Sequence, residues 1–359
     1  MANNESNPIP PGASVSVMSR IIQVALCFVL IGAITGGLGW SLARARTPDP
    51  ARAVQPGNVS AMTNANGIPY VVNPEWVVER MAADDPKLVI VDLSPIAAYN
   101  QEHVPGAVHG WWQDGTDQNR PTFGQRLTDE ASPDDRERWF QSLGIGPEST
   151  VVVYDNNHDR DAARMVWLLS YSGVPNATVL SGGIGAWKGA LLETTSVSTT
   201  PGEGATIPVQ PADEIIMTTD ELARRLGDPS LVIIDGRTES ERQDTLNDTI
   251  LVGQIPGAIP VQWPVLMGNS GAVLRSTADL EAIFSQIGLA KGQEIVVYGR
   301  FGTESGLLWL ALTSAGYTNV RIYDAGWSYW AARGDLPIEV DPDAPNIYAS
   351  SARTSRIVA

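Results

Sequence analysis

KLVIVDLS (87–94) and SLVIIDGR (230–237) are two copies of one apolar stretch, and each copy ends with an aspartate, Asp92 in the first and Asp235 in the second. Neither apolar run alternates with polar residues as a half-exposed strand would. Such runs are typical of strands buried on both faces of a parallel sheet. The sequence therefore predicts two parallel sheets, each containing one of these stretches.

The rest of the chain repeats in the same order and at nearly the same spacing. VPGA (104–107) matches IPGA (255–258), STVVVYD (149–155) matches EIVVYGR (294–300), and VLSGGIGAW (179–187) matches IYDAGWSYW (322–330). Segments between the strands, such as TTDELARRLG (218–227), carry the 3.6-residue period of amphipathic helices. We therefore expect an α/β fold of two tandem domains, 71–193 and 215–340, each with a small parallel sheet covered by helices on both faces. An interdomain linker (194–214) and a C-terminal tail (341–359) complete this organisation.

Composition excludes several classes of function. A chain of 359 residues is long enough for two cores. Its formal net charge of −16 and the lack of a basic stripe argue against nucleic-acid binding. Cys27 is the sole cysteine, so a disulfide within the chain and a CxxC site are both impossible. The three histidines show no ligand spacing, and we expect neither a metal site nor a cofactor.

One segment is long and apolar enough to cross a membrane. Residues 21–42 are 22 residues without a charge, which as a helix would extend about 33 Å. We predict a single transmembrane helix over 20–43, between a polar tail (1–19) and a linker (44–70). Ala43-Arg44-Ala45 resembles a signal-peptide cleavage site, so removal of the segment is the alternative.

The sequence leaves the orientation and packing of this helix open. Arg44, Arg46 and Arg52 follow the span and favour a cytoplasmic location for the domains. The short N-terminal tail and the thiol-free soluble part favour an extracytoplasmic (periplasmic) location, which is our expectation. Gly32 and Gly36 form a GxxxG pattern that would let a partner helix in the bilayer approach closely, although glycine is also simply frequent in membrane helices.

Taken together, the landmarks resemble the tandem form of the rhodanese (thiosulfate and mercaptopyruvate sulfurtransferase) family. In the first half they are Asp92, Tyr99, His103-Val-Pro-Gly-Ala107, Val153-Tyr-Asp155, Ala163-Arg164, Trp167, Leu180-Ser-Gly-Gly183 and Trp187. In the second half they are Asp235, Arg237, Ile255-Pro-Gly-Ala258 and Tyr298. The resemblance covers nearly everything from about 70 to 340 and implies two rhodanese-like domains.

The resemblance also points to one loop. In that family the loop after the second-half strand begins with a cysteine that carries sulfur as a persulfide, and backbone N–H groups and the next helix stabilise the anion. The corresponding loop here reads Gly299-Arg300-Phe301-Gly302-Thr303-Glu304-Ser305, so glycine stands at the reactive position, and Asp155 is its first-half counterpart. The resemblance therefore implies that the catalytic residue is missing.

Other residues around the loop have predicted roles. Arg300 and Arg237 remain as candidate anion partners, whereas the carboxylate of Glu304 would oppose a bound anion. No histidine lies near Thr303 or Ser305 in sequence to activate either hydroxyl as a nucleophile. We expect His103 to hold its turn by hydrogen bonding.

The leading hypothesis is a membrane-anchored, catalytically inactive tandem rhodanese-like protein, a scaffold or accessory subunit of a membrane protein complex. Photosynthetic or respiratory complexes are conceivable hosts, with contacts through the transmembrane helix and the soluble domains. One alternative is a sulfurtransferase that depends on a partner's thiol. Another is a module that binds a small anion on the loop 299–305.

Overall fold

A computed structural model of the chain describes residues 60, 62–110, 133–207, 212–242, 252–268, 271–300 and 302–340, with the backbone of 357–358. The tail 1–19, the predicted membrane helix 20–43 with Gly32 and Gly36, and residues 44–59 and 61 of the predicted linker 44–70 lie outside these residues. Phe301 also lies outside them. Among the residues that are described, none of the helices is long and apolar enough to cross a membrane.

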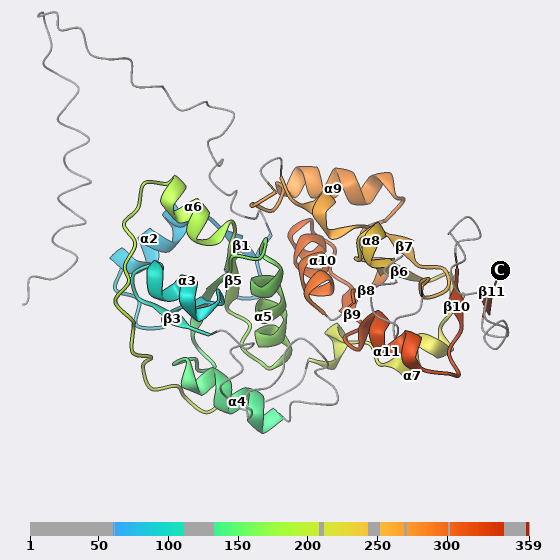
Figure 1. The fold of residues 1–359 in the computed structure, drawn as a ribbon, viewed down its shortest axis with the longest axis horizontal. Coiled ribbons are helices and arrows are strands. Elements are labelled where there is room, and N and C mark those ends of the chain that lie inside the picture. Colours follow the sequence, from blue (N-terminus) through green and yellow to red (C-terminus); the bar gives the residue numbers. More distant parts are fainter. Residues whose placement is uncertain are drawn as a thin grey trace, which may run out of the picture. The chain divides into compact units, whose positions relative to one another are not determined.

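The strands form two parallel sheets, which confirms the predicted α/β class (Figure 1). The first sheet has the order β1-β5-β4-β2-β3, with β1 Val71–Val72, β2 Leu88–Asp92, β3 Ala107–His109, β4 Thr150–Tyr154 and β5 Ala177–Leu180. The second has the order β7-β6-β8-β9, with β6 Leu231–Asp235, β7 Ile259–Pro260, β8 Glu294–Tyr298 and β9 Val320–Ile322. A separate parallel pair joins β10 (Ile338–Glu339) to β11 (Ile357–Val358).

Helices connect the strands of each sheet. In the first half they are α2 Pro74–Ala82, α3 Ile96–Gln101, α4 Pro133–Ser142, α5 Arg160–Tyr171 and α6 Gly183–Gly189. In the second half they are α7 Thr219–Arg224, α8 Glu239–Arg242, α9 Thr277–Gln286, α10 Thr303–Ser314 and α11 Gly326–Ala332, with short 3-10 turns η2 Asp213–Ile215 and η3 Trp263–Leu266. Side-chain caps start several of them: Asn73 accepts a hydrogen bond from Trp76 N, and Ser276 from Asp279 N.

Both faces of each sheet are buried, as the unalternating apolar strands predict. In β4, Val151 and Val153 belong to one hydrophobic cluster, whereas Val152 and Tyr154 belong to another. Because successive side chains of a strand point to opposite faces, this division means that apolar layers cover both sides of the sheet. The β8 strand is divided in the same way between two clusters.

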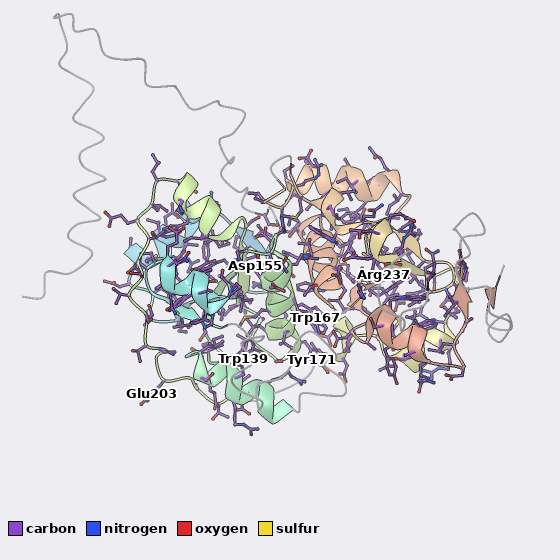
Figure 2. The ribbon with its side chains drawn as sticks, viewed as in Figure 1. Trp139, Asp155, Trp167, Tyr171, Glu203 and Arg237 are labelled. Carbon is purple, nitrogen blue, oxygen red and sulfur yellow. The ribbon has the colours of Figure 1, made fainter. Side chains whose placement is uncertain are left out.

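One of these clusters is shared by the two halves of the chain. It contains residues of α5 and of α10, which pack against each other. An ideal Cβ on Gly306 of α10 would lie 2.8 Å from both Cα and N of Arg164 on α5, so a side chain at 306 would force the helices apart. On α5, Trp167 and Tyr171 stack with ring centroids 5.5 Å apart (Figure 2).

The internal repeat is visible in the hydrogen bonds as well as in the sequence. Tyr154 OH accepts a hydrogen bond from Val104 N at 3.0 Å, and Tyr298 OH accepts one from Ile255 N at 3.2 Å. The indole N–H groups of Trp187 and Trp330, at matching positions, each donate to a backbone carbonyl at 2.8 Å. The two halves are therefore two copies of one structural unit.

Candidate functional site

The loop predicted to matter most lies directly between strand β8 and helix α10. The strand ends at Tyr298, Gly299 follows it, and α10 begins at Thr303 with Gly302 as its N-cap. Gly302 has φ of 107°, a left-handed conformation that glycine adopts without strain. The loop therefore connects the end of a buried strand to the N-terminus of a 12-residue helix.

Gly299 has no side chain, and the space that a side chain would take is filled. An ideal Cβ at Gly299 would lie 2.5 Å from Oε2 of Glu304, 2.7 Å from its Cβ and 3.2 Å from Ser305 N. The φ of Gly299 is outside the left-handed region, so the backbone itself would accept another residue. Glycine is therefore favoured at position 299 because Glu304 fills the space of a side chain, and not because of backbone strain.

Glu304 folds back onto the loop that precedes its own helix. Its Oε2 accepts a hydrogen bond from Arg300 N at 3.1 Å, and its Oε1 accepts one from Thr303 Oγ1 at 3.1 Å. Arg160, from the first half of the chain, places Nη1 3.5 Å from Oε1. Glu304 is only 5% exposed, and its negative charge lies at the positive end of α10. A carboxylate of the chain itself therefore occupies the anion position of this loop.

The first-half loop is also capped by a carboxylate. Asp155, the counterpart of Gly299, is buried and accepts hydrogen bonds from the backbone N–H groups of Asn157, Asp159 and Ala162 at 2.7 to 3.0 Å. Burial raises the pKa of Asp155, and these backbone hydrogen bonds oppose the increase. In both halves, backbone N–H groups of the loop therefore donate to a carboxylate of the chain itself. In the first half this carboxylate is Asp155, the first residue of its loop. In the second half it is Glu304, which accepts from Arg300 N.

A second buried acid, Asp159, joins the two halves. It accepts hydrogen bonds from Ser181 Oγ at 2.5 Å and Gly182 N at 2.9 Å. The same hydroxyl of Ser181 accepts a hydrogen bond from Leu274 N at 2.9 Å. Burial, with a smaller contribution from Asp155, raises the pKa of Asp159 to about 7. The sequence alone did not single out this linkage.

Two arginines of α5 face the second-half loop. The guanidinium of Arg160 lies over the ring of Trp263 at 4.4 Å while reaching Glu304. Arg164 is 1% exposed and forms an ion pair with Asp324. Its Nε and Nη1 have no hydrogen-bond partner among the described residues, and its guanidinium carbon lies 3.1 Å from where a Cβ on Gly302 would be. Neither the contact of Arg160 with Glu304 nor that of Arg164 with Asp324 could be predicted from sequence spacing, because the partners are more than 100 residues apart.

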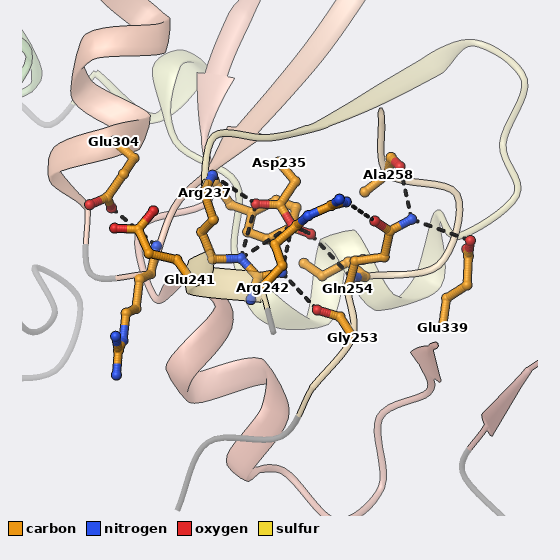
Figure 3. A network of polar contacts seen from close by, with 12 residues as sticks. Asp235, Arg237, Glu241, Arg242, Gly253, Gln254, Ala258, Glu304 and Glu339 are labelled. Atoms are coloured by element: carbon orange, nitrogen blue, oxygen red, sulfur yellow. Dashed lines mark hydrogen bonds and ion pairs between the residues drawn. The ribbon is translucent and has the colours of Figure 1, made fainter. Parts of the chain in front are cut away.

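The two arginines predicted as anion partners have different surroundings. Arg237 is fully buried and directs Nε and Nη2 to the carboxylate of Asp235, with 2.6 Å between Nη2 and Oδ2 (Figure 3). Tyr298 OH donates to the same carboxylate at 2.7 Å, and the guanidinium lies 4.5 Å from the ring of Trp327. These contacts give Arg237 a role in the fold. Arg300 contributes its backbone N–H to Glu304.

A second set of polar contacts lies beside this buried pair (Figure 3). Gln254, which stands where the first half has His103, donates from Nε2 to Ala258 O and to Glu339, and accepts from Arg242. In the first half, His103 stacks on Tyr99, and its ring nitrogens face the carbonyl oxygens of Tyr99 and Val197 at 2.7 and 3.1 Å. The prediction that His103 holds its turn by hydrogen bonding is confirmed.

The described part of the chain offers no evident substitute for a thiol in this loop. The hydroxyl of Ser305 is buried and donates to Gly302 O at 2.8 Å, whereas that of Thr303 donates to Glu304. Within the described ranges, no group of three or more His, Cys, Asp or Glu side chains is arranged to hold a metal ion. The described residues of the loop therefore offer backbone donors and a carboxylate, and none of them is a cysteine.

The chain belongs to the rhodanese-like domain family, whose model matches residues 73–190 and again 218–333. It is 32% identical over 281 residues to a thiosulfate sulfurtransferase of Pseudomonas aeruginosa, covering 78% of this chain and all of the relative. It is 29% identical over 288 residues to a 3-mercaptopyruvate sulfurtransferase of Escherichia coli, covering 75% of this chain and 98% of that one.

A solved structure agrees with this assignment. The crystal structure of SseA from Escherichia coli, a 3-mercaptopyruvate sulfotransferase, superposes with a TM-score of 0.62 at 26% identity. The superposition covers 72% of this chain and 98% of SseA. The chain is thus a tandem rhodanese-like protein related to thiosulfate and 3-mercaptopyruvate sulfurtransferases over their full length.

Proposed function

We propose that this tandem rhodanese-like protein does not carry sulfur on its own loop, and that it acts as a scaffold or accessory subunit. One observation supports the first part: Gly299 follows β8 where the family resemblance expects the sulfur-carrying cysteine, and Cys27 is the only cysteine of the chain. A persulfide needs a thiolate to hold the transferred sulfur, and glycine has none.

The comparisons, taken alone, favour the alternative of a sulfurtransferase. The relatives from Pseudomonas aeruginosa and Escherichia coli are both named as sulfurtransferases and match over nearly their whole length. If this chain shares their reaction, the thiol must come from another protein. A partner's cysteine would have to approach the loop where the Glu304 carboxylate lies, and this carboxylate would repel a thiolate.

The scaffold part of the proposal comes from the sequence. Residues 21–42, with the GxxxG pair Gly32 and Gly36, would anchor the chain in a bilayer and pack against helices of partner subunits. With the anchor in place, an extracytoplasmic position suits domains that contain no thiol.

A thiosulfate–cyanide assay separates the two functions. The unmodified full-length chain should form no thiocyanate above the level of a heat-denatured sample, while the Pseudomonas aeruginosa relative serves as the positive control. Gly299→Cys with Glu304→Gly restores the thiol and removes the carboxylate that would crowd it, and it should form thiocyanate. Turnover by the unmodified chain alone would contradict the proposed inactivity. Turnover only after addition of a thiol-bearing partner would favour the alternative.

The scaffold role has its own test. Extraction of the native membrane with a mild detergent, followed by identification of co-purifying subunits, should recover the chain in a stoichiometric complex. Deletion of residues 1–43 should release it from that complex. A chain that purifies alone from its native membrane would contradict the scaffold role.

A further inference from the structure

His103 is fully buried, and each nitrogen of its ring faces an oxygen atom that can only accept a hydrogen bond. Nδ1 lies 2.7 Å from the carbonyl oxygen of Tyr99, and Nε2 lies 3.1 Å from that of Val197. A neutral imidazole has one N–H donor and one bare nitrogen, whereas the imidazolium has two donors. Only the charged ring can therefore donate to both carbonyl oxygens.

The two carbonyl groups belong to different segments. Tyr99 lies in helix α3, whereas Val197 lies in the linker that leads from the first domain to the second. The backbone of this linker is also paired with the turn after α3, since His103 N donates to Thr195 O at 2.8 Å and Thr195 N donates to His103 O at 3.0 Å. Thr199 N donates to the hydroxyl of Tyr99 at 3.1 Å. The His103 ring thus lies where the interdomain linker is held on the first domain.

We propose that His103 is a buried imidazolium that holds the interdomain linker on helix α3 as a latch, and that the latch opens when the ring loses a proton. The charged ring donates to both carbonyl oxygens, whereas the neutral ring keeps a single donor. Because the contact with Tyr99 is the shorter one, the neutral ring keeps its proton on Nδ1 and releases Val197. The latch is therefore closed at acidic pH and opens as the pH rises through the range in which histidine titrates. It does not depend on the proposed function.

The surroundings of the ring stabilise a positive charge. Hydrogen bonds from a charged donor are stronger than neutral ones, and His103 makes two of them. Its ring stacks on that of Tyr99, with centroids 3.8 Å apart and planes inclined by 9°, so the charge lies over an aromatic face. These contacts offset the cost of burying a charge, which is high for an ion without partners.

The elements packed around His103 carry other titratable groups. They are Asp92, Tyr99, Glu102, His109, Tyr154, Lys188 and Glu193. The carboxylate of Glu102 is ion-paired with Lys188 of α6, and that of Asp92 accepts a hydrogen bond from Ser94 N. Among the described residues, the ring nitrogens of His103 contact only the two carbonyl oxygens, so the charge of the ring itself decides whether both are used.

The second half of the chain has the same junction without a titratable ring. Gln254 stands at the position of His103, and its backbone pairs with that of Glu339 through hydrogen bonds of 2.8 and 3.0 Å, as His103 pairs with Thr195. Its side-chain amide, which stays neutral, donates to Ala258 O and to Glu339. Glutamine is therefore a residue that this structural unit already accepts at the position, and the second-half junction should not respond to pH near neutrality.

The direct test is nitrogen-15 NMR of the full-length chain, labelled at histidine and held in detergent micelles. Long-range correlations give the shifts of both ring nitrogens, which lie close together in an imidazolium and far apart in a neutral ring. His109→Gln and His158→Gln identify the other two histidines, so the signals of His103 are assigned without changing it. We expect two protonated nitrogens at pH 6, and loss of the proton at a higher pH than for the exposed His158. A bare nitrogen on His103 at pH 6, or loss of its proton together with that of His158, would overturn the inference.

Amide hydrogen exchange tests whether the linker responds. The peptide that covers residues 194–200 is compared at pH 6 and pH 8.5, after correction for the intrinsic dependence of exchange on pH. Its protection should fall about tenfold or more in the unmodified chain, as expected when a hydrogen bond from a charged group is lost, and should not change in His103→Gln. The peptide that contains Glu339 is the control and should keep its protection in both. Equal protection at the two pH values in the unmodified chain would contradict the latch. So would a fall that persists in His103→Gln, since it would belong to another group, such as Asp159.

Discussion

Replacing Gly299 with alanine tests whether Glu304 is the reason for glycine at the family's reactive position. The new Cβ would lie 2.5 Å from Oε2 and 2.7 Å from Cβ of Glu304, both shorter than real Cβ contacts. Overfilling of a packed site typically costs about 1–3 kcal/mol. If the carboxylate swings away, its hydrogen bond from Arg300 N is lost, and a hydrogen bond to a charged group is worth about 1.5–3 kcal/mol. We expect Gly299→Ala to reduce the free energy of unfolding by about 2–4 kcal/mol.

A double-mutant cycle isolates the contact between the two residues. Glu304→Ala removes the carboxylate contact but keeps the contact at 2.7 Å between the two Cβ positions, whereas Glu304→Gly removes both. The cost of Gly299→Ala should therefore fall by about 1 kcal/mol in the Glu304→Ala background and by about 2–3 kcal/mol in the Glu304→Gly background. Urea unfolding of all variants at one pH provides the free energies.

Gly185→Ala is the matched control, because a Cβ at Gly185 would meet nothing within 4 Å. It lies in α6, and a glycine-to-alanine change in a helix should leave stability unchanged or raise it by up to about 1 kcal/mol. Additive effects within about 0.5 kcal/mol in both Glu304 backgrounds would refute the reasoning. So would a cost of Gly299→Ala no larger than that of Gly185→Ala.

Three further predictions concern the buried charges and the contact between the two halves. The pKa of Asp159 is raised to about 7 in the folded chain from an ordinary value of 3.8, so this group stabilises the fold fully below pH 4, and the stabilisation is lost as pH rises through 7. Urea midpoints should accordingly show that the chain is more stable at pH 5 than at pH 8. The difference should be smaller in Asp159→Asn. An unchanged pH dependence in that variant would contradict the raised pKa of Asp159. Arg237→Met leaves Asp235 buried without its cation and should reduce the free energy of unfolding by about 3–5 kcal/mol in the same assay. Arg333→Met, which breaks an exposed pair with Asp335, should reduce it little. Equal losses in the two variants would show that the buried pair stabilises the fold no more than the exposed one. Gly306→Ala should cost about 1–3 kcal/mol, because its Cβ would lie 2.8 Å from the Arg164 backbone, and a neutral result would mean that α5 and α10 separate easily.

The α/β class and the two parallel sheets could be predicted from the sequence because they depend on local patterns. The runs ending at Asp92 and Asp235 are strands in two parallel sheets, and the matched tyrosines, Tyr154 and Tyr298, pair with those aspartates in register. The resemblance to the rhodanese family pointed to the loop, and in the structure Gly299 directly follows β8 and α10 follows the loop. The fold class needed only periodicity and the order of landmarks along one chain, whereas the loop's importance came from the family resemblance.

The interior of the site depends on side-chain directions that sequence spacing does not fix. The sequence indicated that the Glu304 carboxylate would oppose an anion, but not that it would fold back and bind Arg300 N itself. The contacts of Arg160 with Glu304 and of Arg164 with Asp324 join residues from different domains. No local sequence pattern therefore predicts them. Arg237 is the reverse case: its buried pair with Asp235, two residues away, could have been suspected from the Asp-x-Arg spacing.

Residues 60–340 contain no cysteine, and we propose that none of their side chains holds transferred sulfur. The most direct measurement is the mass of the intact full-length chain after incubation with thiosulfate, with peptide mapping to locate any added atom. We expect no added sulfur atom between residues 60 and 340 of the unmodified chain, and one on residue 299 of the variant that combines Gly299→Cys with Glu304→Gly. A sulfur atom found on any peptide of the two rhodanese-like domains of the unmodified chain would contradict it.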